Sequence, residues 1–487
     1  PTSRKSNPIS GCPLAVLTWG LPCNCCISPG IQRPTLAASS SAKRRPRRVV
    51  YQMALALRTI LAVVAVVALA CPAAGRQLKV DGGVPSNPNT TPGPVANPEA
   101  TLRNIGATIS GLIYNELRGN DIGVRNGIYA ELASTRAGTS IVDLKVELSA
   151  IISNVIIGNE NIADNVISVL LGNNAFIERL DAAVEAFAIN DINGAANEAA
   201  NIQWYDLVGQ NGGDNILKNL FLEISGLTYN KIGDATGAVS GDNNELLNTL
   251  GVYTNLGSNA NNPNFPTSLP FNEENGLKLP GGIGDMSQTN MTVIVDAILL
   301  NEVISGSGNY LENFMSISVA NGVDITNVKA EIEAILVNQI EGDDNKVSNI
   351  MDIVLGLCDG RPCGMAEFDM TVSAIMLNDI SGKNNIIDNT IKIVAGTNSD
   401  VLAAQSLDAI KRATLDIEAI IVNTLRSDLV EGIDSNELKN NIMISVLDSI
   451  SVSDLKATIS AIIANDVAGA LNKLENSINI KIGMGRD

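Results

Sequence analysis

The stretch VKAEIEAILVNQIEGDDN, residues 328–345, decides the fold. Ahead of its first asparagine, Asn338, two sets of residues alternate along the chain. One set is apolar or small and the other is charged: Val328, Ala330, Ile332 and Ala334 against Lys329, Glu331 and Glu333. A period of two places such sets on opposite faces of an extended chain. The segment therefore predicts a β-strand with one buried face.

The same pattern occurs nine times. Each copy has Ser, Asp or Glu, then Ala or Gly, a large apolar residue, two variable positions, an asparagine, one variable position, and Ile, Leu or Val. The asparagines are 36 to 45 residues apart, except for one spacing of 71: Asn115, Asn154, Asn190, Asn230, Asn301, Asn338, Asn378, Asn423 and Asn465. Near-constant spacing is typical of proteins whose repeats stack on one another.

Corner signals follow each copy. In six copies a glycine lies four residues after the asparagine, as at Gly342, and further asparagines are frequent at plus seven and plus eleven. Both residue types adopt left-handed backbone conformations cheaply. We therefore expect an all-β chain with one or two coils of a parallel β-solenoid per repeat, and asparagine ladders at roughly 4.8 Å spacing. The chain resembles parallel β-helix proteins at the level of the fold, without a match to a specific family.

An α-solenoid is the alternative, because repeats of about 40 residues also suit pairs of helices. The segment KATISAIIANDVAGALNKLENSI, from Lys456, has acceptable helical periodicity. The Gly and Asn corners, the many Ile and Val residues and the strict alternation ahead of each asparagine favour strands.

The chain before the repeats divides into three segments. Residues 1–52 hold a basic cluster and no acidic residue, and are interpreted as leader or untranslated sequence, or as a bipartite organelle-targeting signal. Residues 53–75 have the basic start, short apolar run and small residues of a signal peptide. The apolar run is too short to span a membrane. Residues 76–100, rich in Pro and Asn, predict a disordered linker.

The repeats themselves divide at the long spacing. We expect repeats one to four in 101–250, a Gly/Asn/Pro-rich loop insertion in 251–290, and repeats five to nine in 291–487. Glycosylation sequons begin at Asn89 and Asn290. Cys358 and Cys363, the cysteines that follow the signal peptide, are expected to form a small disulfide loop in an oxidising compartment.

The charge of the chain is strongly acidic. Removing residues 1–75 takes away nine of the 33 Lys and Arg and none of the 51 Asp and Glu, so the formal net charge changes from −18 to −27. Such a chain repels nucleic acid. The absence of histidine excludes Ser-His-Asp and Cys-His catalysis and His-ligated metals.

Carboxylates are then the remaining catalytic candidates. Asp343 and Asp344 resemble the paired aspartates of polygalacturonases, which act as general acid and base. The Gly-His-Gly and Arg-x-Lys elements of that family have no counterpart in this chain. The pair also occupies the corner position where other copies carry Gly-Lys-Asn or Gly-Asn-Glu, which favours an acidic turn.

Two further columns of side chains are expected to run along the stack. The residues that open each motif should form an outward line, in which Asp296, Glu333 and Glu418 are weak candidates for Ca²⁺. A solvated face is the other interpretation, and no other cofactor is expected. Residues three and one before each asparagine, such as Ile335 and Val337, should also point outward although they are apolar, which favours cover by the variable loops or contact with a partner.

These features predict a secreted or cell-surface structural protein of a matrix or cell wall, without catalytic activity. Its expected partners are matrix polysaccharide, other surface proteins or further copies of the same chain, with no nucleic acid and no membrane span. An adhesion module that binds carbohydrate or Ca²⁺ is the first alternative. A polysaccharide hydrolase or lyase with a β-helix fold is the second.

Overall fold

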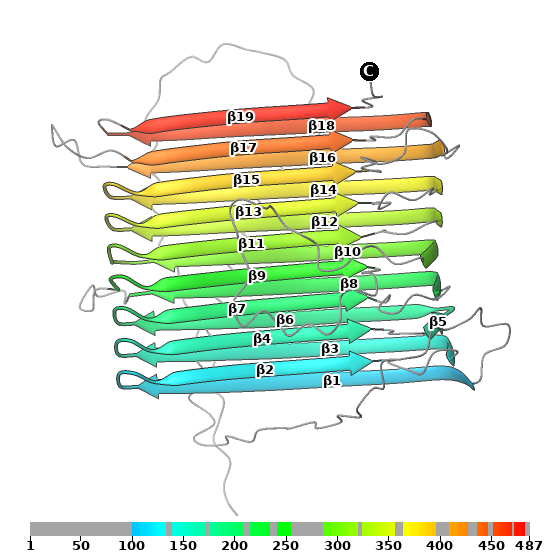
Figure 1. Cartoon of the computed structure of the whole chain (residues 1–487), viewed down its shortest axis with the longest axis horizontal. Coiled ribbons are helices and arrows are strands. Elements are labelled where there is room, and N and C mark those ends of the chain that lie inside the picture. The colour runs from blue at the N-terminus through cyan, green and yellow to red at the C-terminus, as the bar shows by residue number, and fades with distance from the viewer. Residues whose placement is uncertain are drawn as a thin grey trace, which may run out of the picture. The chain divides into compact units, whose positions relative to one another are not determined.

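A computed structural model describes most of the repeat region, which belongs to one compact unit, Gly83–Asp487. The described residues are 100–132, 139–171, 175–207, 215–233, 241–254, 286–319, 324–355, 364–395, 409–426, 436–446, 451–469 and 472–482. Within these ranges every regular element is a β-strand, and the strands pair in parallel in two sheets (Figure 1). The expected parallel β-solenoid is confirmed, and the α-solenoid is excluded.

The first sheet contains the long strands that carry the motif, one of them divided in two. They are β1 (Ala100–Arg118), β3 (Thr139–Ile157), β5 (Ala175–Ile177), β6 (Leu180–Asn193), β8 (Asn215–Ile232), β10 (Met286–Val303), β12 (Asp324–Glu341), β14 (Gly364–Ser381), β16 (Ala409–Arg426) and β18 (Ser451–Ala468). Each motif asparagine pairs with the motif asparagine of the next long strand, as Asn338 does with Asn378.

The second sheet contains the shorter strands, each of which follows a long strand in the sequence. They are β2 (Gly123–Leu132), β4 (Ile162–Leu171), β7 (Glu198–Leu207), β9 (Glu245–Thr254), β11 (Tyr310–Val319), β13 (Lys346–Leu355), β15 (Ile386–Ala395), β17 (Glu437–Val446) and β19 (Lys473–Ile482). Residues 251–254 and 286–290, expected in the loop insertion, thus belong to β9 and β10. Residues 255–285 lie outside the described part.

Each long strand bends once, eleven residues before its asparagine. The residue at the bend leaves the ladder and has a left-handed backbone conformation with φ between 54° and 61°: Asn104, Asp143, Asn219, Asn290, Asn327, Glu367, Arg412 and Asp454. In the third copy Arg179 takes this place, and the long strand is interrupted there, between β5 and β6. The bend turns the first residues of each long strand away from the rest of the sheet.

The interior divides into a large core and a small one. The large core lies between the sheets, where alternate residues of both layers are buried, such as Ile332 and Ala334 from β12 and Met351 from β13. The small core lines the corner between a long strand and its short strand, and includes Ile340 and Val347. Complete burial of an Ile or Leu contributes about 1.5–3 kcal/mol, so the stacked repeats stabilise one another.

The corner glycines stack in contact with one another. Gly342 has φ +152°, and a Cβ atom built there would lie 1.8 Å from the carbonyl oxygen of Gly306 in the preceding coil. Ser381 accepts a hydrogen bond from the Gly342 amide on the other side, at 2.9 Å. The coil spacing therefore leaves no room for a side chain at this corner.

Gly342→Ala should lower the free energy of unfolding by about 2 kcal/mol or more, because the methyl group meets rigid backbone at a left-handed φ. Chemical denaturation measures the change. Gly106→Ala is the matched control, because nothing lies within 4 Å of a Cβ built at Gly106. Equal stability of the two variants would contradict the corner geometry.

Candidate functional site

The most distinctive arrangement in the structure is a double ladder of asparagines that runs through the interior. One rail consists of the nine motif asparagines, paired in register along the first sheet. The other consists of asparagines from the short strands: Asn126, Asn165, Asn201, Asn248, Asn313, Asn349, Asn389, Asn440 and Asn476. The two rails lie between the large and the small core.

The bonds of Asn338 show how the rails are joined. Its Nδ2 donates to Oδ1 of Asn349 at 3.0 Å and to Oδ1 of Asn378 at 2.7 Å. Its Oδ1 accepts from Nδ2 of Asn301 at 3.2 Å and of Asn313 at 2.8 Å. Both donor hydrogens and both acceptor positions of a side chain that is 1% exposed are therefore used. Repeated along the stack, this pattern forms one continuous hydrogen-bonded spiral.

A third ladder stabilises the corner. In its middle, the backbone N and the Nδ2 of Asn345 both donate to Oδ1 of Asn385, at 2.9 and 3.1 Å. The Nδ2 of Asn385 in turn donates to the carbonyl oxygen of Gly342 at 3.1 Å. These side chains satisfy backbone groups that a tight corner would otherwise bury without a partner.

Asn338→Asp should destabilise the fold by several kcal/mol at neutral pH. It removes two donors and leaves a buried carboxylate opposite acceptor oxygens, and each unsatisfied buried group costs about 1–3 kcal/mol. Gln339→Glu makes the same chemical change at the next, exposed residue and should have little effect. Chemical denaturation of both variants measures the difference, and similar losses would show that the ladder contributes little.

The acidic pair at the corner after β12 is engaged in the turn. Oδ1 of Asp343 accepts from the backbone N of Lys383 at 2.9 Å, and Oδ1 of Asp344 accepts from Nδ2 of Asn384 at 3.1 Å. Asp344 has φ +59°. Each carboxylate therefore bonds to the corner of the next coil.

The three acidic candidates for Ca²⁺ do not form one group. Asp296 and Glu333 are neighbours in register, whereas Ser373 separates Glu333 from Glu418. Partial burial, and then the charge of Glu333, raises the pKa of Asp296. Within the described ranges, no group of three or more Cys, Asp or Glu side chains is placed to hold a metal ion.

The apolar residues expected to point outward are partly covered. Ile335 is buried, while Val337 and the equivalent Ile375, Leu377 and Ile420 are half-buried. In the end coils the equivalent Leu112, Tyr114 and Ile462 are exposed, so only the inner coils shield these positions in part.

Sequence reasoning missed the burial of the Asp352 carboxylate on β13. The residue is 6% exposed, its Oδ2 accepts from Nζ of Lys392 at 3.3 Å, and its Oδ1 has no hydrogen-bond partner in the described part of the chain. Burial raises the pKa of Asp352, and the Lys392 charge offsets only part of that rise. Nothing in the sequence distinguishes this residue from the exposed acids around it.

Asp352→Asn should increase the free energy of unfolding at pH 7. A raised folded-state pKa means that folding favours the neutral carboxyl, so the wild type loses stability as the pH rises from 3.8, the ordinary value, through the higher folded-state value. The advantage of the variant should disappear below pH 3.8. Denaturation at both pH values tests this, with Asp369→Asn as an exposed control, and a variant less stable at pH 7 would contradict the assignment.

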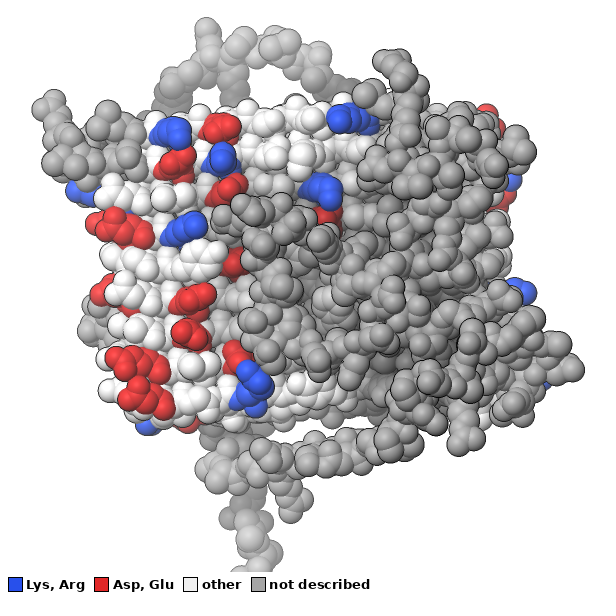
Figure 2. Space-filling view, in the orientation of Figure 1, with Lys and Arg blue, Asp and Glu red and all other residues white. Residues whose placement is uncertain are grey.

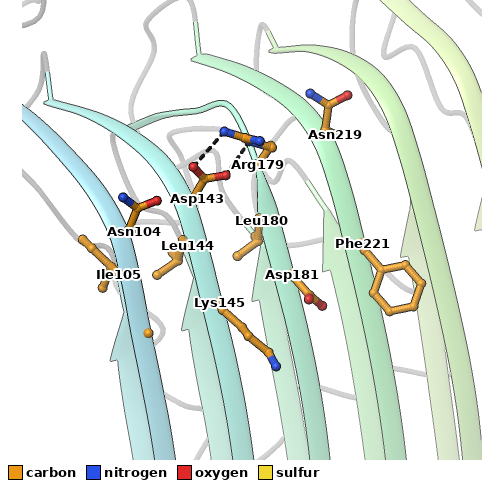
Figure 3. A pocket seen from close by; sticks show the side chains of 11 residues that line it. Asn104, Ile105, Asp143, Leu144, Lys145, Arg179, Leu180, Asp181, Asn219 and Phe221 are labelled. Atoms are coloured by element: carbon orange, nitrogen blue, oxygen red, sulfur yellow. Dashed lines mark hydrogen bonds and ion pairs between the residues drawn. The ribbon is translucent and has the colours of Figure 1, made fainter.

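A surface hollow of about 650 Å³ lies where β1, β3, β6 and β8 bend (Figure 3). Asp143 and Arg179 form an ion pair beside it, with Nη2 of Arg179 2.7 Å from Oδ2 of Asp143. Lys145, Asp181 and Phe221 also line it, and Phe221 is 39% exposed. The hollow thus combines an aromatic ring with both signs of charge.

Several predicted features lie outside the described residues: the leader, the signal peptide, nearly all of the linker, the sequon at Asn89, and the Cys358–Cys363 pair. The second sequon is described. Asn290 is exposed at a bend, where its Nδ2 donates to Asn219 at 2.9 Å and its Oδ1 accepts from Asn327 at 2.7 Å.

No protein-family model matches the sequence, and neither a curated protein nor a solved structure does. The structure thus defines the class, a parallel β-solenoid, and no family. A search of the described residues finds no helix that is long and apolar enough to cross a membrane.

Proposed function

We propose that this chain is a secreted or cell-surface structural protein, a stiff element of a matrix or cell wall, and that it has no catalytic activity. The observation that carries the proposal is the double asparagine ladder. It joins every coil to its neighbours through side-chain hydrogen bonds, so the interior asparagines bond to one another across the stack. A chain built in this way resists bending and local unfolding, which suits a mechanical role.

The sequence supports the extracellular part of the proposal. Residues 53–75 have the pattern of a signal peptide, sequons occur at Asn89 and Asn290, and Cys358 and Cys363 suit an oxidising compartment. The acidic surface favours solubility and repels other polyanions. Rows of acidic and basic side chains lie on one face (Figure 2). Ion pairs between neighbouring coils include Lys473 with Glu437 and Arg125 with Asp164.

Expression of the full chain in a secreting eukaryotic cell tests this proposal. The product should appear in the medium or at the surface, with its N-terminus near Gly75. Its electrophoretic mobility should increase after endoglycosidase treatment. Asn89→Gln and Asn290→Gln identify the modified sites. Retention of an unprocessed product in the cytoplasm or an organelle would contradict the proposal.

A binding module is the second candidate, favoured by the hollow beside Phe221. Aromatic rings and charged groups together are common in sites that bind sugars. Phe221→Ala should abolish retention on an acidic or neutral polysaccharide if the hollow binds it, whereas the structural proposal expects no change. Release of reducing or unsaturated sugars, lost in a chain with Asp343→Asn and Asp344→Asn, would instead establish an enzyme.

A further inference from the structure

The two ends of the solenoid differ from its middle, because within the described part of the chain their strands pair on one side only. The first sheet ends at β1 and β18, and the second at β2 and β19. At the C-terminal end the interior is uncovered: Ile478, Ile480 and Ile482 are 47%, 42% and 51% exposed. Their counterparts one coil earlier, in β17, are 0–1% exposed. Open strand edges and bare apolar groups of this kind promote association.

The double ladder gives the two ends of the solenoid opposite hydrogen-bonding character. Every Nδ2 of the double ladder donates toward the C-terminal end, so the direction of these bonds never reverses along the stack. In the first coil, Oδ1 of Asn115 accepts no hydrogen bond from a described residue. In the last coil, Nδ2 of Asn476 donates no hydrogen bond to a described residue. One end therefore presents acceptors and the other presents donors.

The terminal coils also match each other in sequence. In the register that pairs Asn423 with Asn465, a further coil placed on β18 would bring Asn115 opposite Asn465. The same shift places like residues of β1 on those of β18: Thr108 on Thr458, Ile109 on Ile459, Ser110 on Ser460 and Ile113 on Ile463.

The short strands are complementary in the same register. Asn126 would lie opposite Asn476 and Ile128 opposite Ile478. Arg125 would lie opposite Glu475, which repeats the arrangement within the chain, where Arg125 contacts Asp164 of the neighbouring strand at 3.2 Å. The corner ladder would not continue, because Ile122 stands where later coils have asparagine. Three of the four features that join coils within the chain thus recur at the ends: the backbone edges, the apolar columns and the double ladder.

We propose that the C-terminal coil of one molecule docks on the N-terminal coil of a second copy, which continues both sheets and the double ladder. This deepens the proposed structural function by naming the partner, and it rests on that function for its purpose. The contact is head-to-tail, so it does not close on two molecules and builds an open filament. Contact between two C-terminal ends would place donors against donors.

The direction of assembly can be tested with two blocked variants of the full chain. Ile478→Lys places a charge on the bare C-terminal face, and Ile109→Lys places one on the half-buried N-terminal face. Asn479→Lys adds the same charge to an exposed residue that alternates to the outer face of β19, and serves as the control. Circular dichroism and thermal melting show whether each variant folds.

Sedimentation velocity and electron microscopy then measure assembly. The wild type and Asn479→Lys should form filaments as the concentration rises, and each blocked variant should raise the concentration required about tenfold or more. An equal mixture of the two blocked variants should stop at dimers, because each supplies the end that the other lacks.

Three results would overturn the filament: a wild type that stays monomeric, assembly of both folded blocked variants as well as the wild type, or a mixture that remains monomeric. If Ile478→Lys fails to fold, Ile480→Lys replaces it at the C-terminal face. If Ile109→Lys fails to fold, Ile113→Lys replaces it at the N-terminal face. A secreted monomer would refute the filament and leave the extracellular function standing. Filaments formed by a chain that cells do not export would support the filament and refute the extracellular function.

Discussion

The need to satisfy buried amides governs this structure. An asparagine in the interior has two donor hydrogens and two acceptor positions, and leaving any of them unpaired costs about 1–3 kcal/mol. The neighbouring coil at the parallel-sheet spacing supplies the partners, and the second rail supplies the rest. A shift of one residue in any coil would break both rails and turn its apolar columns outward. The ladder therefore fixes the register of each coil on the next. Apolar residues of similar size specify that register less strictly.

This constraint explains where the sequence varies. The apolar columns accept Ile, Leu, Val or Met because the core requires only volume and shape, as Leu336, Met376 and Ile421 show in one column. The corner after the long strand requires a small residue because stacked carbonyls approach it closely. The bend eleven residues before the asparagine requires only a left-handed conformation. Asn, Asp, Glu and Arg all occur there.

The sequence predicts the layers well, because the information is local. Alternation ahead of Asn338 gives the long strand, Gly342 gives the corner, and the recurrence of the motif gives the stacking. The sequence shows the asparagines at plus eleven but not their pairing with the motif asparagines, because that pairing depends on how far one sheet lies from the other. The bend carried no single residue type, and Asp352 is buried by surroundings that the sequence pattern does not encode. The chemistry of the ends is likewise a property of the stack and of no single repeat.

The central claim is that the asparagine side chains form one continuous interior hydrogen-bonded network. Hydrogen exchange of the side-chain amides in a protein labelled with ¹⁵N-asparagine tests it most directly. Amides of the middle rungs, such as Asn338 and Asn349, should exchange many orders of magnitude more slowly than those of exposed asparagines such as Asn479. The last rung, Asn476, should exchange faster than the middle ones. Rapid and uniform exchange of all asparagine side chains would contradict the account.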